Sequence, residues 1–182
     1  RPNQQFAAGH LAGSLNVPAD GRMAETVGMV VGPHDEVVVL AEPGEEQAVA
    51  TRFSRIGFDH VLGYVPDPEG FLKRHAQRVV QASRLTAVET AAAIERGGVQ
   101  LVDVRNSGEL AGGIIPGATH IPLAELQRRL PELDPTRSVI TYCAGGWRSC
   151  VAASVLRANG FDDASDLLGG YAAWVLLNPL AS

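Results

Sequence analysis

The sequence predicts an α/β protein of two similar domains, each a small parallel sheet flanked by helices, with the first domain truncated at its N-terminus. Helical and strand patterns alternate along residues 86–177, which is typical of parallel strands joined by helices. The chain also resembles itself at an offset of 104 residues. This match begins at Arg1, whose counterpart Arg105 lies well inside the second copy.

The internal repeat is carried by residues that fix backbone turns. Residues 1–18 align with residues 105–122, and the identical positions include two glycines and a proline. A Gly-Phe-Asp tripeptide recurs at residues 57–59 and 160–162, shifted by one position. Matched glycines and prolines imply matched turns, so we expect two copies of one fold.

The second copy, which we place at residues 77–182, has a complete set of elements. Thr86 is suited to cap a helix that Gly97 and Gly98 end, and an apolar strand follows. In chain order, we predict a helix at 86–96, strands at 99–104 and 118–121, a helix at 123–130 stopped by Pro131, a strand at 138–142, a helix at 149–159, a strand at 164–168 and a helix at 171–177.

The first copy, which we place at residues 1–76, is incomplete. Nothing in it corresponds to the helix at 86–96 or the strand at 99–104, so its sheet should have a raw edge. We therefore expect the natural protein to extend beyond Arg1. Residues 71–83 would connect the copies, with Val79 and Val80 pairing in the second sheet.

Composition limits the classes of function. The 182 residues are 46% hydrophobic and 19% charged, as in an ordinary globular protein, and carry a net charge of −5 without a basic stripe. Nucleic acid is therefore not an expected partner, and the apolar runs are too short to cross a membrane. Two cysteines cannot form a disulfide framework, so we expect a reducing compartment and a cytoplasmic protein.

The chemistry concentrates where the predicted strand at 138–142 ends in Cys143. Gly145 and Gly146 let the following loop curl around the sulfur, and its free amides form an anion-binding cluster. Arg148 adds a positive charge, and Ser149 is suited to cap the next helix. Each of these features favours the thiolate over the thiol, so Cys143 is a candidate nucleophile.

The segment Cys143–Ser149 reads C-A-G-G-W-R-S, residues 101–105 read L-V-D-V-R, and residues 113–118 fit G-x-x-P-G-A. Together these motifs resemble a rhodanese domain, over all of the second copy and more weakly over the first. The resemblance implies a five-stranded parallel sheet with helices on both faces, and sulfurtransferase chemistry. The family often has histidine where this chain has Ile114, which argues against catalysis by that position here.

The resemblance also implies roles for the site residues. Cys143 would attack the outer sulfur of thiosulfate or a persulfide, become a persulfide, and pass the sulfur to a thiol or cyanide, without metal or cofactor. Asp103 and Arg105 would form a structural ion pair. The substrate cradle would comprise Ala144, Gly145, Gly146, Trp147, Arg148 and Ser149.

The remaining expectations concern alternatives and partners. Related phosphatases place five residues between cysteine and arginine, whereas Cys143 and Arg148 enclose four, which favours sulfur. The first copy has no cysteine and three glutamates in the loop at residues 41–46, so we expect it to be inactive. Such a pair resembles the C-terminal part of metallo-β-lactamase-fold/rhodanese fusion proteins. The chain could instead be a non-catalytic regulatory or sulfur-delivery module of such a hydrolase or persulfide dioxygenase, and the raw edge would allow a homodimer.

Overall fold

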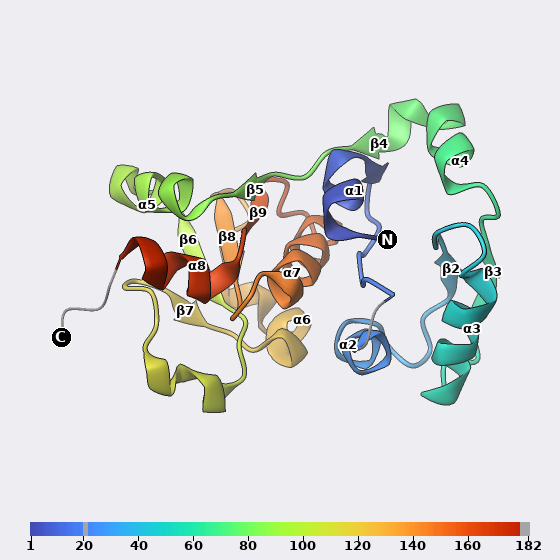
Figure 1. The fold of residues 1–182 in the computed structure, drawn as a ribbon, viewed down its shortest axis with the longest axis horizontal. Coiled ribbons are helices and arrows are strands. Elements are labelled where there is room, and N and C mark those ends of the chain that lie inside the picture. Colours follow the sequence, from blue (N-terminus) through green and yellow to red (C-terminus); the bar gives the residue numbers. More distant parts are fainter. Residues whose placement is uncertain (20–21, 179–182) are drawn as a thin grey trace. The chain divides into compact units, whose positions relative to one another are not determined.

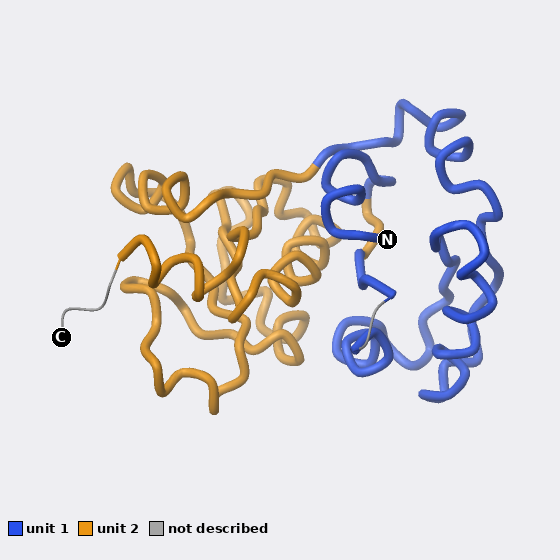
Figure 2. The backbone as a smooth tube through the Cα atoms, viewed as in Figure 1, with its two compact units in different colours: residues 1–12, 16–81 blue, residues 13–15, 82–182 orange. Residues whose placement is uncertain are grey.

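The computed structural model describes residues 1–19 and 22–178, which form two compact units (Figure 2). Unit 1 comprises residues 1–12 and 16–81, and unit 2 comprises residues 13–15 and 82–182. The first unit therefore ends at Gln81, a few residues beyond the boundary at residue 76 expected from the sequence.

Unit 2 is built on a five-stranded sheet in which all neighbouring strands are parallel. The order β5-β9-β8-β6-β7 places β8 in the centre (Figure 1). The predicted parallel α/β architecture is confirmed, although the sequence pattern does not reveal the short β5. The strands are β5 (Arg84–Leu85), β6 (Gln100–Asp103), β7 (Thr119–His120), β8 (Val139–Tyr142) and β9 (Ala164–Leu167).

Helices cover both faces of this sheet. On one face α7 (Trp147–Ala158) packs against β8 and β9, and Thr141 Oγ1 donates to the carbonyl oxygen of Ser149 at 2.8 Å. On the other face α5 (Ala87–Arg96) and α8 (Gly170–Leu177) cover Ile140 and Leu167. Ile140 and Thr141 point to opposite faces because successive strand residues alternate. Full burial of each aliphatic side chain contributes about 1.5–3 kcal/mol.

One predicted helix is divided into three short pieces. The segment expected as a helix at 123–130 forms η3 (Leu123–Glu125), α6 (Leu126–Arg129) and η4 (Leu130–Glu132). Pro131 has no N–H to close an α-helical hydrogen bond, so the last turn tightens to a 3₁₀ conformation before the chain turns away.

Unit 1 has a much smaller sheet. Its β2 and β3 are parallel, and a core formed by α2, α3 and these strands includes Val27, Val39 and Phe53. Its elements are α1 (Asn3–Ala8), β1 (His10–Leu11), α2 (Met23–Val30), β2 (Val37–Val39), α3 (Glu46–Arg55), β3 (Val61–Tyr64), α4 (Pro68–Arg74), η1 (Ala76–Arg78) and β4 (Val79–Val80).

The expected pairing of Val79 and Val80 with the second sheet is wrong. They form β4, which pairs antiparallel with β1 inside unit 1, with His10 opposite Val80. The edge of the second sheet beside β9 is already taken by Arg84 and Leu85 of β5.

Positions matched by the internal repeat share backbone conformations. Gly13 and Gly117 have φ of 80° and 81°, and Gly44 and Gly146 both have φ of 90°. A side-chain contact also recurs. Arg1 Nη1 donates to the carbonyl oxygen of Gly9 at 3.1 Å, and Arg105 Nη2 donates to that of Gly113 at 2.8 Å. Gly9 and Gly113 are counterparts in the sequence alignment. These segments thus fold alike locally.

The sheet faces of the two units differ in cover. Val38 and Tyr64 of unit 1 are 54% and 57% exposed, and Leu62 beside them is 62% exposed. In the internal repeat, Val38 corresponds to Ile140 at an offset of 102, and Tyr64 corresponds to Leu167 at an offset of 103. Ile140 and Leu167 are buried under α5 and α8. Unit 1 therefore has an uncovered apolar sheet face, in line with the incomplete sheet expected from its sequence.

Thr86 caps α5 with a complete capping box, since its side chain accepts from Glu89 N and the Glu89 carboxylate accepts from Thr86 N. We predict that Thr86→Ala lowers the free energy of unfolding of unit 2 by about 1 kcal/mol. Both tryptophans lie in unit 2, so denaturant unfolding followed by tryptophan fluorescence measures this unit. Val88→Ala is the control, because Val88 on the same helix is 62% exposed. An equal loss in both variants would contradict the prediction.

Candidate active site

Cys143 lies at the carboxyl end of the central strand β8, immediately before α7. All four residues of β8 are buried, so the strand fixes where the cysteine emerges. The carboxyl ends of parallel strands are the usual place for ligand sites in open α/β sheets. The loop that follows therefore occupies the position expected for a substrate site.

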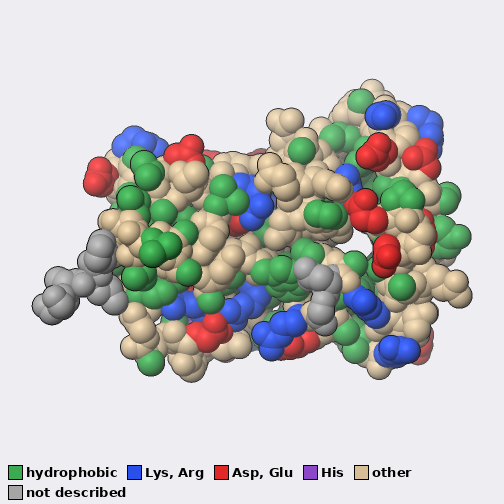
Figure 3. Space-filling model, viewed as in Figure 1, with side chains coloured by type: hydrophobic (Ala, Val, Ile, Leu, Met, Phe, Trp, Pro, Cys, Tyr) green, Lys and Arg blue, Asp and Glu red, His purple; other side chains and the backbone are tan. Residues whose placement is uncertain are grey.

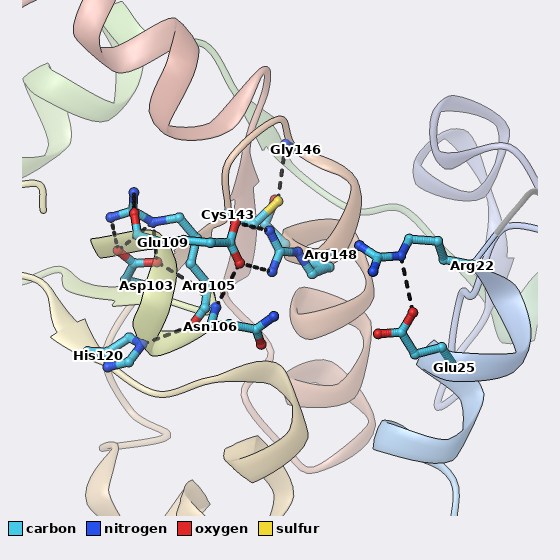
Figure 4. A network of polar contacts seen from close by, with 11 residues as sticks. Arg22, Glu25, Asp103, Arg105, Asn106, Glu109, His120, Cys143, Gly146 and Arg148 are labelled. Carbon is cyan, nitrogen blue, oxygen red and sulfur yellow. Dashed lines mark hydrogen bonds and ion pairs between the residues drawn. The ribbon is translucent and has the colours of Figure 1, made fainter. Parts of the chain in front are cut away.

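The Cys143 sulfur is held by groups of the loop and of α7 (Figure 4). Gly146 N donates to Sγ at 3.1 Å, and Ser149 Oγ lies 3.6 Å from the same sulfur. The residue is only 1% exposed. A backbone N–H, a hydroxyl and the N-terminal end of the 12-residue α7 therefore lie beside the buried sulfur.

The helix after the loop begins earlier than its sequence indicates. Gly146, not Ser149, is the N-cap residue of α7, and it has a left-handed φ of 90°. A Cβ atom at Gly146 would lie 2.9 Å from Gly169 N, so the position needs glycine for space as well as conformation. Ser149 is instead a buried residue of the first turn, where its hydroxyl faces the sulfur.

Backbone N–H groups at the N-terminal end of α8 donate hydrogen bonds to carbonyl oxygens of the loop. Tyr171 N donates to the carbonyl oxygen of Cys143 at 2.7 Å, and Ala172 N donates to that of Ala144 at 3.1 Å. A Cβ atom at Gly170 would lie 2.3 Å from the Cys143 oxygen. Gly170 therefore permits the close approach that engages these carbonyls. Gly170 is not among the site residues expected from the sequence, although the pair Gly169-Gly170 before the predicted helix is a signal of close backbone approach.

Arg148 forms a bidentate ion pair with Glu109. Arg148 Nη1 donates to Glu109 Oε2 and Nη2 donates to Oε1, both at 2.6 Å (Figure 4). The hydrogen bonds from Arg148 hold the pKa of Glu109 at about 2, and Glu109 raises the pKa of Arg148. Sequence reasoning missed Glu109. Its signal was the capping-box spacing from Asn106, whose backbone N–H donates to Glu109 Oε2 at 3.0 Å.

Asp103 and Arg105 form a buried ion pair at the end of β6. Arg105 Nε and Nη2 donate to the Asp103 carboxylate at 2.5–3.0 Å. Arg105 also donates to the carbonyl oxygens of Glu109 and Gly113, and its guanidinium lies over the Tyr171 ring at 4.2 Å. This network ties β6 to the segment that carries Glu109.

The remaining predicted cradle residues belong to the loop after Cys143 and to the first turn of α7. Ala144 and Gly145 are exposed at the loop surface, and Trp147 and Arg148 are half-buried. Cys150 is buried in α7, and neither it nor Cys143 forms a disulfide. Within residues 1–19 and 22–178, no cluster of three or more His, Cys, Asp or Glu side chains could hold a metal ion. No helix in that part of the chain is long and apolar enough to cross a membrane.

A family model for the rhodanese-like domain matches residues 86–177, slightly more than half of the chain. The chain belongs to the rhodanese-like domain family. Reduced CoADR-RHD of Bacillus anthracis is a similar solved structure, with a TM-score of 0.51 and 33% identity over 54% of this chain and 17% of that chain.

Curated relatives agree with this assignment. The chain is 38% identical over 76 residues to a sulfurtransferase of Allochromatium vinosum, covering 42% of this chain and 71% of that protein. It is 43% identical over 75 residues to the uncharacterized protein YqhL of Bacillus subtilis, covering 41% of this chain and 60% of that protein. This rhodanese-like domain therefore has sulfurtransferases among its relatives.

We predict that Gly170→Ala destabilises unit 2 by about 1–3 kcal/mol more than Gly160→Ala. Both glycines have positive φ, 57° and 85°, so alanine is strained at either position. Only at Gly170 does the added Cβ meet backbone, whereas nothing lies within 4 Å at Gly160. Denaturant unfolding of the two variants measures the difference, and equal free energies would show that the contact with Cys143 is unimportant.

We predict that the Glu109 carboxyl titrates at about pH 2, well below the ordinary value of about 4.3. Because its pKa is lowered in the folded protein, its stabilising contribution is complete above the ordinary value and is lost as the pH falls toward 2. Carboxyl ¹³C NMR would follow the titration, and Arg148→Gln should return the pKa toward the ordinary value. A wild-type midpoint near 4.3 would refute the assignment.

Proposed function

We propose that the chain is a rhodanese-type sulfurtransferase in which Cys143 carries sulfane sulfur as a persulfide. The observation that supports this most directly is the Gly146 N–H directed at Cys143 Sγ, in the loop between the central strand and α7. Membership of the rhodanese-like family and the sulfurtransferase relative of Allochromatium vinosum point to the same chemistry.

The reaction would proceed in two half-reactions. The Cys143 thiolate attacks the outer sulfur of thiosulfate or of a persulfide, the S–S bond breaks, and sulfite or a thiolate leaves with the electron pair. A thiol or cyanide then attacks the outer sulfur of the Cys143 persulfide and restores the thiolate. Neither step requires a metal or an organic cofactor.

The loop length supports sulfur over phosphate as the transferred group. Four residues separate Cys143 from Arg148, and the Gly146 amide lies on the sulfur itself. The Gly146 amide thus points at a single atom of Cys143, which suits the single added sulfur of a persulfide. Hydrolysis of an aryl phosphate that depends on Cys143 would favour the phosphatase alternative.

We propose further that unit 1, the first copy of the repeat, has the same fold as unit 2 but is inactive. Ala41 is the counterpart of Cys143, and Glu46 is the counterpart of Arg148. Gly44 N, the counterpart of the amide that donates to the cysteine sulfur, donates to the Glu46 carboxylate at 2.9 Å. A carboxylate of the chain thus fills the anion position, and no thiol is present to accept sulfur.

The second candidate function is a non-catalytic regulatory or sulfur-delivery module within a larger metallo-β-lactamase-fold hydrolase or persulfide dioxygenase. The uncovered face of β2 and β3 favours a larger protein, because parallel sheets are normally covered on both faces. Sequencing the gene upstream of the codon for Arg1 would test this arrangement, and turnover by the present chain would exclude a purely non-catalytic role.

We predict that treatment with a sulfane donor adds one sulfur atom to the protein at Cys143, detectable by intact-mass spectrometry and peptide mapping. Cys143→Ala should abolish the addition and the transfer of sulfur to cyanide. Cys150→Ala is the matched control, since it removes the other cysteine, which is buried in α7, and should retain both. No added sulfur from thiosulfate, mercaptopyruvate or glutathione persulfide would refute the proposed function.

A further inference from the structure

The positive charge of Arg148, beside the Cys143 sulfur, is already balanced by the Glu109 carboxylate. Arg148 lies next to Cys143, and its proximity to that thiol contributes to its raised pKa after the larger effect of Glu109. A thiolate, a guanidinium and the Glu109 carboxylate together leave a formal charge of −1. Arg105, whose guanidinium lies over the Tyr171 ring, is itself paired with Asp103. An incoming donor therefore does not meet an unpaired arginine at either position.

The Glu109 carboxylate is fixed in this position from several sides. Its two oxygens both accept from Arg148, and one also accepts from Asn106 N. The Glu109 backbone carbonyl accepts from Arg105 Nη1 at 3.3 Å. The side chains of Arg148 and Glu109 are 19% and 33% exposed, so water screens the pair only in part. A substrate cannot release the Arg148 charge without breaking a short bidentate ion pair.

This arrangement treats the two classes of sulfur donor differently. Thiosulfate brings two negative charges, and its leaving group, sulfite, retains them. An organic persulfide brings at most one negative charge at its reacting end. Like charges in a partly buried site repel, and repulsion grows with the charge of the incoming group. The paired Arg148 should consequently disfavour thiosulfate much more than an organic persulfide.

The geometry points to Glu109 as a specificity-determining residue that makes low-molecular-weight organic persulfides, R–S–SH, the preferred donors and disfavours dianionic thiosulfate. This inference rests on the proposed sulfurtransferase function. In the favoured step the Cys143 thiolate attacks the outer sulfur of R–S–SH and the S–S bond breaks. The leaving R–S⁻ takes the electron pair, and the proton stays on the new Cys143 persulfide. No external oxidant or reductant is consumed.

The test compares kcat/KM for loading Cys143 from thiosulfate and from glutathione persulfide. The wild type should prefer the persulfide. Glu109→Gln keeps a hydrogen-bond acceptor for Arg148 but removes the charge, so the thiosulfate-to-persulfide ratio should rise at least about fivefold, mainly through a lower KM for thiosulfate. Glu95→Gln is the matched control, since it removes the same charge from an exposed position on α5 and should leave the ratio unchanged.

Ionic strength provides a second measurement that needs no variant. Repulsion between the site and thiosulfate predicts that the wild-type kcat/KM for thiosulfate rises with added salt, whereas attraction to a free arginine predicts a fall. An unchanged donor ratio in Glu109→Gln, or a wild type that prefers thiosulfate with a rate that falls with salt, would overturn the inference. Failure of both donors to load Cys143 would instead refute the proposed function itself.

Discussion

The site depends on how the peptide groups of one loop are turned. The backbone N–H groups of Tyr171 and Ala172, at the start of α8, hold the carbonyl oxygens of Cys143 and Ala144. With these oxygens held on the α8 side, the Gly146 amide is free to donate to the Cys143 sulfur. The N-terminal ends of two helices thus contact one loop. The N-cap residue of α7, Gly146, donates to the Cys143 sulfur, and the first turn of α8 donates to the loop carbonyls. The cradle is a property of the backbone, which is why glycine is required where the two helices meet the loop.

Charge is controlled separately from this backbone frame. On the face drawn in Figure 3, acidic and basic side chains are interspersed. At the site, Arg148 is paired with Glu109. In the sequence alignment Glu46 of unit 1 stands where unit 2 has Arg148, and its carboxylate accepts a hydrogen bond from Gly44 N. The two loops therefore differ in the sign of the charge at one aligned side chain.

Local signals predicted most of unit 2 from the sequence. The strand that ends at Cys143, the glycine loop and the helix after it are contiguous, and their residues carry the signal together. The start of α7 was misplaced because serine is the better cap on average, whereas the left-handed Gly146 decides the start here. Glu109 and Gly170 could not be assigned to the site from local pattern, since tertiary folding brings them to it from 34 and 27 residues away in the chain.

The two units separate what a local sequence determines from what its surroundings determine. Gly44 and Gly146 share the same φ and each stands just before a helix, yet the sheet that contains β2 has two strands and the sheet that contains β8 has five. The conformation of the loop glycine therefore does not depend on a complete sheet. The burial of the strand before the loop does depend on its surroundings, because Ile140 is 2% exposed beneath α5 and α8 whereas its counterpart Val38 is 54% exposed. The proposed sulfur chemistry uses both levels, because the loop directs the Gly146 N–H at the sulfur while the surrounding helices hold the loop and limit the water around it. The aligned loop of unit 1 has the same glycine conformation, but its sheet lacks that cover and it has no cysteine.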